Sequence, residues 1–548
     1  MDRLSRGVLV FVGGCALELL APNAGIAQMG ADEVFSDPEL AGTTSASDGA
    51  NADEMVFEDP ELAGASNASS SGSGFNNSAA PQFLADAGLI WHSRLGMDLR
   101  YSDPREETWE NTNIALLEAN IRRSETLRFQ MGTRLRLYAG ALTRDVPDAQ
   151  AERVELDATP VSGYVDWTVA NGVHLQAGYQ SVQLGRFEIV SATDVLTIAD
   201  TRNGPATLPE AYEVGQLALR LDVDATSWLS IKAYYVPFFT PYIMSVNEGD
   251  YALLPLRQAE VSADLDALML SSTIAENFSR ADRERLAMTG LSAFAPEIGL
   301  DKQQSALRVG ARGGFGEVAL TAVTAIEKVP SIYFSPEAIA YLAEPNTIEV
   351  AEAFEMARQP IRVAYNRFYL LSLDAEFDAA PFLLGFELAY NFKRTLPTLG
   401  RGAYPYTLPL PEQTDLAQLG AKVEYQGGAD FVATVEAFGM YALQAPTDPM
   451  RGWMFLEAGR YLAGVAAGAY WAPAETHLRI ELGVMAMTPE TLVVAPRVLY
   501  RVVDALELEL GALIIEGPAP PLAVTPRIAV GTMYDTVDQV FVGFVYKL

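Results

Sequence analysis

Apolar and polar residues alternate along much of this chain, in repeated segments of about 10–15 residues that begin near Leu89. A period of two places apolar side chains on one face of a β-strand and polar side chains on the other. Four clear examples have the apolar faces Leu89, Trp91, Leu95, Met97, Leu99 and Tyr101; Leu127, Phe129, Met131, Leu135 and Leu137; Tyr369, Leu371, Leu373 and Phe377; and Leu506, Leu508, Leu510 and Ile514. The chain therefore predicts a large all-β fold whose sheet has one apolar side.

Aromatic residues recur ten positions apart on the apolar face of several segments. The pairs are Trp91 and Tyr101, Phe382 and Phe392, Phe431 and Tyr441, and Tyr461 and Trp471. Ten residues span roughly 33 Å along a strand, and about 25 Å along the membrane normal once the strand is tilted by about 40°. That is the height of the apolar band between the two aromatic girdles of a membrane barrel. The spacing therefore favours a transmembrane barrel in outer-membrane lipid over a soluble β-sandwich.

The last residues continue the alternation to the end of the chain. Val540, Val542, Phe544, Tyr546 and Leu548 share one face, which resembles the signature by which the barrel-assembly machinery recognises outer-membrane barrels, here ending on Leu instead of an aromatic residue. We predict that residues 83–548 form a closed antiparallel transmembrane β-barrel. Bacterial single-chain barrels have an even number of strands, and our prediction is 18, with 16 or 20 as alternatives.

Turn signals and irregular stretches divide the predicted strands. Short turns are predicted at Asn171-Gly172, Gly313-Gly314, Gly427-Gly428 and Asp504-Ala505. Longer connections are predicted near 188–212, 239–304, 328–361 and 395–415. Two stretches of helix formers, 275–293 and 336–358, predict short helices in the long loops. Those helices would either constrict the barrel from inside or cap it.

The N-terminus predicts export. Residues 1–27 have the basic start, apolar stretch and small-residue end of a secretory signal peptide, with cleavage after Ala27. The alternative is a lipoprotein signal with a lipidated Cys15. Because Cys15 is the only cysteine, no disulfide is expected in the processed chain.

Residues 28–82 are rich in Asp, Glu, Ser, Ala, Asn and Gly and contain no Lys or Arg, which predicts a disordered acidic periplasmic tail. A nine-residue motif occurs twice within it, at 34–42 and 56–64. The positions predicted to bind a periplasmic partner are Phe35, Asp37, Pro38 and Leu40 in the first copy, and Phe57, Asp59, Pro60 and Leu62 in the second. The alternative is a duplicated spacer that binds nothing.

The net charge of the chain limits the partners it can bind, and the positions of its charged residues predict what lines the barrel interior. A net charge of −32 argues against nucleic acid as a partner. The predicted pore-lining basic residues are Arg94, Arg100, Arg122, Arg128, Arg134 and Arg136. The predicted pore-lining acidic residues are Asp374, Glu376, Asp378, Glu387, Glu424, Glu436, Glu507 and Glu509, with Glu481 on the same face. In a closed barrel one basic wall would face a largely acidic one across a wetted lumen; alternatively, the charges pair and fill the interior.

The sequence gives little sign of enzymatic chemistry. Its histidines, His92, His174 and His477, lie in separate predicted strands without metal-ligand spacing. His92 faces inward and could belong to the Ser–His pair of a phospholipase or the Asp–His arrangement of a barrel protease, but nothing near it supports either. We therefore predict no catalytic site, no metal and no cofactor.

Over residues 88–548 the chain resembles porin-like outer-membrane proteins. Residues 184–186 with 194–195, then 200–202 and 236–241, are similar to alginate-export-type and related uncharacterised barrels. The resemblance implies an outer-membrane channel for passive passage of small polar solutes or a polymer. The alternative is an outer-membrane anchor whose tail motifs dock a periplasmic or envelope-spanning machine.

If the two tail motifs are docking elements, their aromatic anchors should carry the binding. We expect Phe35→Ala or Phe57→Ala to weaken capture of the partner, and the double substitution to weaken it more than the two single losses predict, because bivalency is lost. The measurement is a pull-down from envelope extract with the isolated 28–82 peptide. Recovery of the same proteins by the double variant would make the repeat a spacer.

Overall fold

The computed structural model describes residues 84–99, 109–141, 152–187, 190–200, 202, 213–243, 299–314, 316–337, 361–400, 410–428, 430–449, 451–453, 456, 460–473, 476–488, 490–517 and 538–548. The predicted signal peptide, Cys15 and the acidic tail with both motifs lie outside these residues. So do Arg100, the predicted helix at 275–293 and all but the first two residues of the helix predicted at 336–358.

The described part of the chain is almost entirely β-structure. The first strands are β1 (Leu84–Asp98), β2 (Trp109–Ser124), β3 (Leu127–Ala141), β4 (Glu152–Ala170), β5 (Val173–Gln180), β6 (Ile198–Ala199), β7 (Glu213–Val214), β8 (Gln216–Thr226), β9 (Leu229–Val236), β10 (Gln304–Gly313), β11 (Gly316–Ile326) and β12 (Ser331–Phe334). The remaining strands are β13 (Ile361–Ala364), β14 (Arg367–Ala379), β15 (Phe382–Gly400), β16 (Leu410–Gln426), β17 (Phe431–Ala442), β18 (Arg451–Trp453), β19 (Tyr461–Trp471), β20 (Leu478–Met487), β21 (Thr491–Val503), β22 (Leu506–Glu516) and β23 (Gln539–Lys547). Among the described residues, the 3-10 turn η2 spans Leu300–Lys302.

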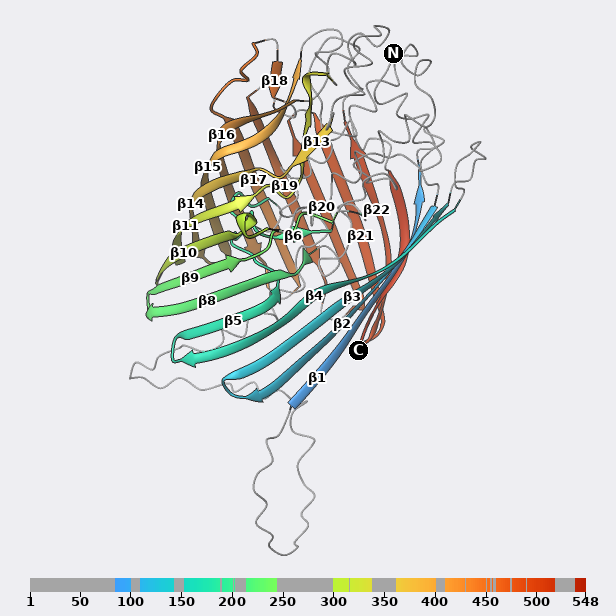
Figure 1. Ribbon diagram of the computed structural model, residues 1–548. Coiled ribbons are helices and arrows are strands. Elements are labelled where there is room, and N and C mark those ends of the chain that lie inside the picture. The colour runs from blue at the N-terminus through green and yellow to red at the C-terminus, as the bar shows by residue number, and fades with distance from the viewer. Residues whose placement is uncertain are drawn as a thin grey trace, which may run out of the picture.

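Eighteen of these strands form one closed antiparallel barrel (Figure 1). Each barrel strand pairs with the next one along the chain, and β1 closes the ring by pairing with both β2 and β23. The remaining strands stay outside the ring order: β6 pairs with β7, β12 pairs with β13, and β18 extends the end of β15. The prediction of an 18-stranded barrel is confirmed.

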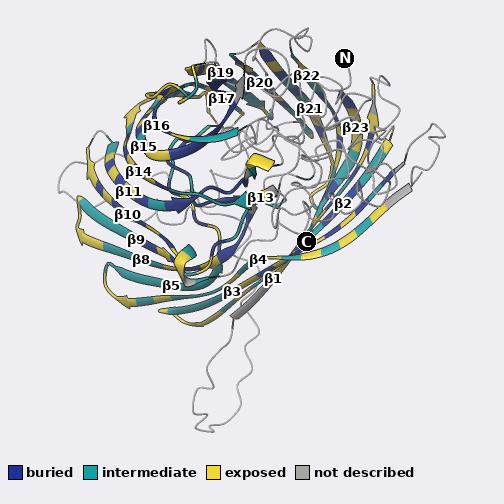
Figure 2. Cartoon of the chain, turned by 45° about the horizontal axis from the view of Figure 1, so that its top comes forward, coloured by how far each residue is buried: buried dark blue, intermediate teal, exposed yellow. Residues whose placement is uncertain are grey.

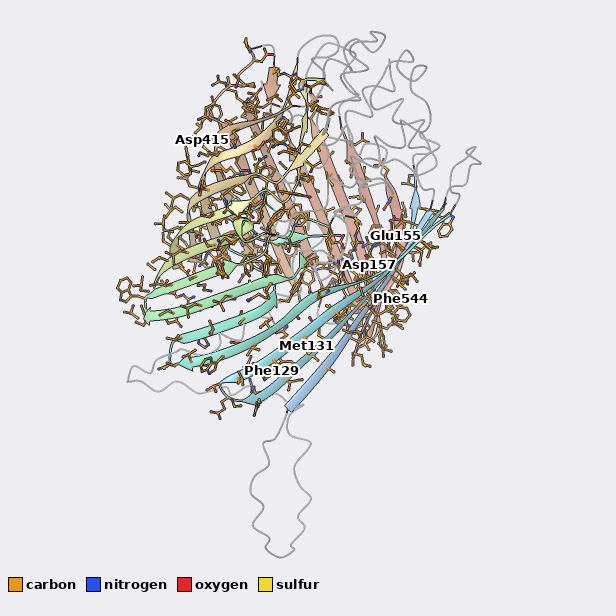
Figure 3. All side chains as sticks on the ribbon, viewed as in Figure 1. Phe129, Met131, Glu155, Asp157, Asp415 and Phe544 are labelled. Carbon is orange, nitrogen blue, oxygen red and sulfur yellow. The ribbon has the colours of Figure 1, made fainter. Side chains whose placement is uncertain are left out.

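The barrel has the reverse polarity of a soluble protein. Outward side chains such as Leu156, Met131 and Leu388 are 77%, 60% and 57% exposed, whereas inward Arg134, Arg136 and Glu436 are fully buried. Figure 3 locates Met131 on β3 and Phe544 on the outward side of β23. An apolar outer surface around a polar interior is what a lipid solvent requires of a barrel. Within the described part of the chain, no helix is long and apolar enough to cross a membrane.

The predicted aromatic girdles form where neighbouring strands meet. Phe431 pairs with Trp471 at one end of the β17–β19 ladder, and Tyr441 pairs with Tyr461 ten residues along. On the strands beside them, Phe382 pairs with Tyr425 and Tyr369 pairs with Phe392. The outward rings of these residues are about 40% exposed, except that of Phe431, which is partly buried. Two rows of aromatic side chains therefore border the predicted apolar band on strands β14 to β19. The predicted partner of Trp91, Tyr101, lies outside the described residues.

The two ends of the barrel differ in the length of their connections. At the end near Leu548, which we call the turn end, eight connections are short, and they include the four predicted turns. At the opposite end, the loop end, every connection is longer than these turns except the one at 488–490. This asymmetry is the usual one for bacterial barrels.

The loop predicted at 395–415 is wrong, because β15 and β16 continue as a paired hairpin to 400 and 410. The ladder shifts register at a bulge, where Lys393 has a φ of +60°. The carboxylate of Asp415, labelled in Figure 3, accepts the Lys393 N–H at 2.9 Å and the Tyr390 hydroxyl at 3.2 Å. These hydrogen bonds hold the kink, so the hairpin extends beyond the aromatic girdle.

The seam between β1 and β23 depends on one glycine. Arg94, Gly543 and Glu509 stand side by side on β1, β23 and β22. A Cβ at 543 would lie 2.3 Å from the Ser93 carbonyl oxygen, so the seam has no room for a side chain there. Arg94 reaches over the glycine and donates to Glu509 at 3.1 Å. The interior charges thus tie the first strand of the ring to the last two.

Deleting residues 544–548 should prevent closure while leaving export intact. The deletion removes the β23 residues that pair with Ile90, Trp91, His92 and Ser93, and an open edge is not tolerated in lipid. Closed barrels resist detergent until boiled, so the measurement is heat-dependent mobility in gels of outer-membrane fractions. Normal insertion of the truncated chain would contradict the assigned seam; Leu548→Phe, which keeps the pairing, is the control.

Candidate functional site

The lumen of the barrel is the candidate site, and a segment of the chain is folded into it. The strands β5, β8 and β9 are only 8, 11 and 8 residues long, whereas β4 has 19. The chain leaves β5 after Gln180, well before the loop end, and turns inward (Figure 2). We call residues 181–202 the insert; of these, 181–187, 190–200 and 202 are described.

Apolar residues of the insert pack against an apolar sector of the inner wall. Val182, Leu184 and Leu196 are almost fully buried in this cluster. The wall residues beneath them, contributed by β8, β9, β10, β11, β14 and β15, are Ala218, Tyr234, Val236, Ala306, Val323, Ala325, Phe368, Leu370 and Ala389. This core resembles that of a soluble domain, so it holds the insert as a fixed part of the barrel.

Arg186 anchors the insert to an acidic patch on β11 and β14. Its guanidinium pairs with Glu317, with Asp374 at 3.1 Å and with Glu376 at 3.1 Å. Arg308 on β10 pairs with Asp374 from the other side. With the exposed Arg312, which pairs with Glu317 at 3.3 Å, three guanidinium groups therefore compensate three carboxylates, and an unpaired charge in the barrel interior would be strongly destabilising.

Two further carboxylates of the wall bind the backbone of the insert. Glu387 on β15 accepts hydrogen bonds from the N–H groups of Arg186 and Ala192, at 3.1 and 2.8 Å, and from the Ser191 hydroxyl at 3.1 Å. Glu436 on β17 accepts the Val190 N–H at 3.0 Å. An irregular segment has backbone donors without a ladder, and these side chains satisfy them.

The ring of Phe187 occupies a space on the wall that two glycines leave open. A Cβ at Gly420 would lie 2.5 Å from the Phe187 ring, and one at Gly385 would lie 3.2 Å from it. Gly420 pairs in register with Glu387, and Gly385 pairs with Glu376 and Lys422. The glycines are therefore next to the anchoring carboxylates, which lets the ring and the charges bind together.

The other end of the insert is bound to the opposite wall. Asp200 pairs with Arg134 of β3 at 2.5 Å and with Arg202 at 2.6 Å. Arg202 also pairs with Asp157 of β4, and Arg136 of β3 pairs with Glu155 of β4 at 2.7 Å. Figure 3 labels Glu155 and Asp157 on β4. The insert thus crosses the lumen from β11–β17 to β3–β4.

Ion pairing fixes the charges at this end. Burial alone would raise the pKa of Asp200, but the hydrogen bond from Arg202 and the charges of Arg134 and Arg202 hold it below its usual value. The same contacts raise the pKa of Arg202 despite its burial. A depressed carboxyl pKa means that the pairing stabilises the folded insert at neutral pH and is lost only when the pH falls through the depressed value.

A third charge cluster surrounds Glu509 on β22. The carboxylate contacts His92 at 2.7 Å, Arg94 at 3.1 Å and Arg497 of β21 at 2.8 Å. Arg479 of β20 continues the cluster by pairing with Glu481 at 3.0 Å and Glu507 at 3.4 Å. Because β1 closes the ring beside β23 and β22, the acids of β20 and β22 are neighbours of the first arginines and do not face them across the lumen.

The predicted pore-lining residues therefore have different surroundings. The cluster around Glu509 includes Arg94 and Glu507. The cluster around Asp200 includes Arg134 and Arg136. The wall that binds the insert includes Asp374, Glu376, Glu387 and Glu436. Glu424 pairs with Lys422 at 3.5 Å. Arg122 and Asp378 are exposed near the turn end, and Arg128 is partly buried. Whether a solute contacts any of these residues stays a prediction.

Sequence reasoning missed the partners that organise these charges. Arg186, Phe187, Asp200, Arg202 and Arg308 were not among the predicted site residues. Two signals pointed to the insert: the irregular stretch predicted at 188–212 and the resemblance motif within 184–202. Neither indicates that the segment folds inward, because that depends on where β5 ends.

The histidines have ordinary structural contacts. His92 contacts Glu509, His174 lies 3.2 Å from the Thr168 hydroxyl, and His477 packs edge-on against Tyr500. Among the described residues, no group of three or more His, Cys, Asp and Glu side chains could hold a metal ion.

Comparisons with known proteins bear on the architecture alone. No protein-family model matches the chain, and no curated protein matches its sequence. A BenF-like porin from Pseudomonas fluorescens is 8% identical with a TM-score of 0.41, covering 85% of this chain and 98% of the porin. OccK11 of Pseudomonas aeruginosa is 8% identical with a TM-score of 0.41, covering 85% of this chain and 96% of OccK11. OmpF of Salmonella typhi is 9% identical with a TM-score of 0.37, covering 85% of this chain and 97% of OmpF. The fold assignment rests on the strand pairings of this chain.

Arg186→Met should loosen the insert without opening the barrel. It removes the guanidinium group that pairs with all three of Glu317, Asp374 and Glu376, and we expect a local destabilisation of about 3 kcal/mol. Hydrogen exchange should show faster exchange of the insert amides and unchanged exchange of the β1–β3 ladder. Arg312→Met is the control, because Arg312 is exposed and, among the described residues, its one ion pair is with Glu317, at 3.3 Å. Equal exchange in the two variants would contradict the anchoring role.

Proposed function

We propose that this barrel is an outer-membrane channel for passive passage of small polar solutes. The observation that carries the proposal is the distribution of charge inside a closed ring. The apolar core of the insert packs on the sector from β8 to β15, while charged clusters line the sector that runs from β20 through the seam to β4, where the far end of the insert contributes Asp200. So many ionised groups are stable inside a barrel only where water or a charged partner reaches them.

The insert gives the channel a fixed constriction. It is anchored at both ends by ion pairs and between them by an apolar core. A segment held in this way narrows the lumen to the space beside it and does not move freely with the solute. Selection would then depend on the size of the solute and on the charges around Glu509 and Asp200.

The pairing of the arginines favours small solutes over a polyanionic polymer. The resemblance to alginate-export-type barrels rests partly on residues 184–186 and 200–202, which the structure places in the insert. A polyanion requires a run of guanidinium groups free to bind it. Arg134, Arg186 and Arg202 instead bind carboxylates of this chain. The local charge is balanced, which suits neutral or zwitterionic polar solutes.

Orientation follows from the barrel type. We place the turn end, with both termini of the barrel, in the periplasm and the loop end outside the cell. The acidic tail 28–82 is then periplasmic. The anchor function predicted from its two motifs stays a prediction, and the proposed channel does not depend on the tail.

The test is ion conductance in planar bilayers. Purified full-length protein and a variant lacking residues 28–82 should show the same stable single-channel conductance, because the path lies within the barrel. Arg186→Met should increase the conductance or its fluctuations, since the constriction is loosened, whereas Arg312→Met should not. A barrel that stays sealed in all four forms would contradict the channel and favour the anchor.

A further inference from the structure

A cavity inside the ring separates the insert from one sector of the wall. It lies between residues 190–195 of the insert and the wall strands β14, β15, β16, β17 and β19. Its volume is about 40 Å³, and roughly 10–15 Å³ is enough for one water molecule. The space therefore takes about three water molecules, or the core of a small solute, beside the constriction that the insert forms.

Apolar side chains form most of the lining of this cavity. Those of the wall are Phe368 of β14, Leu416 of β16, Phe438 and Met440 of β17, and Leu462 of β19, and all five are buried. Sites for small molecules are typically apolar concavities in which a few polar groups fix the orientation of the ligand. The charged groups of the lining should therefore decide what binds.

The bulge in β15 turns one of these charged groups into the cavity. Because β15 has one more residue than β16 between Asn391 and Arg394, Arg394 pairs with Thr414 and faces inward. Without the bulge, strict alternation would turn Lys393 inward and Arg394 outward. The guanidinium lies over Phe368, 4.1 Å from the ring centroid. A lysine seldom adopts a φ of +60°, so the chain accepts local strain at Lys393 while it holds a cation at the cavity.

The charges around the cavity are balanced. Lys328 is the second cation of the lining, and it is almost fully buried. Asp194 of the insert is the acid among the described lining residues. A second carboxylate, that of Glu327, lies 4.0 Å from the Nε atom of Arg394. Two cations and two carboxylates therefore meet here, and a solute with a net charge would leave this buried site with an uncompensated charge.

We propose that the cavity binds a small amino-acid zwitterion with a short apolar side chain. The carboxylate of the solute binds at Lys328 and Arg394, its ammonium group binds at Asp194, and its side chain packs against Phe438 and Met440. Such a solute pairs both of its charges and adds no net charge to the site. The inference rests on the proposed channel, because a solute reaches the cavity through the lumen.

Binding is measured by saturation-transfer NMR on the full-length protein folded in detergent. The probes are L-alanine, propanoate, which lacks the ammonium group, and ethylamine, which lacks the carboxylate. L-alanine should bind saturably, and the other two should bind about tenfold or more weakly, because each loses a hydrogen bond between charged groups. Equal binding of propanoate and L-alanine would overturn the zwitterion. A protein that conducts ions but does not bind L-alanine saturably would overturn the site and leave the proposed channel intact.

Two charge variants should change the preference in opposite directions. Asp194→Asn keeps an acceptor for the Thr197 hydroxyl, which Asp194 binds at 2.6 Å, but removes the negative charge, so propanoate should become the better ligand. Lys328→Gln keeps a donor and removes the positive charge, so ethylamine should become the better ligand.

Lys422→Gln is the matched control and should keep the preference of the native protein. Lys422 is 3% exposed and Lys328 is 2% exposed, but Lys422 pairs with Glu424 at 3.5 Å and is not among the described residues that line the cavity. Heat-dependent mobility confirms that each variant has folded, and misfolding could not reverse a preference. Folded Asp194→Asn and Lys328→Gln variants that still prefer L-alanine would overturn the site.

Discussion

A membrane sheet must satisfy every backbone hydrogen bond within the protein, and this requirement organises the whole molecule. The ring is complete because β23 returns to β1, so Phe544 and Tyr546 have partners 451 and 455 residues earlier in the chain. Closure also leaves only β23 between the acidic strand β22 and the first basic strand, β1. Gly543 is the point at which backbone pairing and interior charge meet, because its missing side chain lets Arg94 reach Glu509 across β23. The outer surface then follows from the alternation alone.

The second constraint comes from the interior. Eighteen strands enclose more space than their own inward side chains fill, and the wall carries many carboxylates. The insert resolves both problems at once on one sector. Leu184 and Leu196 cover apolar wall, Phe187 fills the space above Gly385 and Gly420, and Arg186 neutralises Asp374 and Glu376. Charges that look like pore lining in the sequence are thereby divided into those that hold the insert and those that pair with one another around Glu509.

The strands of the barrel wall could be predicted from the sequence, but the insert inside the lumen and its contacts could not. Alternation and girdle spacing are local patterns, so strand number, the turn at Asn171-Gly172 and the girdle pairs were all within reach. The hairpin beyond Lys393 was missed because it depends on Asp415, twenty-two residues away, accepting one backbone N–H. The insert was missed for a stronger reason: nothing near Arg186 in sequence indicates that its partners are on β11 and β14. Inward-facing carboxylates such as Glu387 were recognised, but their partners depend on where β5 ends.

Sequence separation within the lumen also dictates an order of folding. Arg186 and Glu387 are 201 positions apart, and Val190 and Glu436 are 246 apart. The strands that receive the insert are therefore synthesised long after it, and its core cannot form until β8 to β17 stand side by side. Until then the segment carries its charges and its phenylalanine in water. The insert can therefore finish docking only after the strands that receive it are in place, and until then the lumen lacks the segment that narrows it.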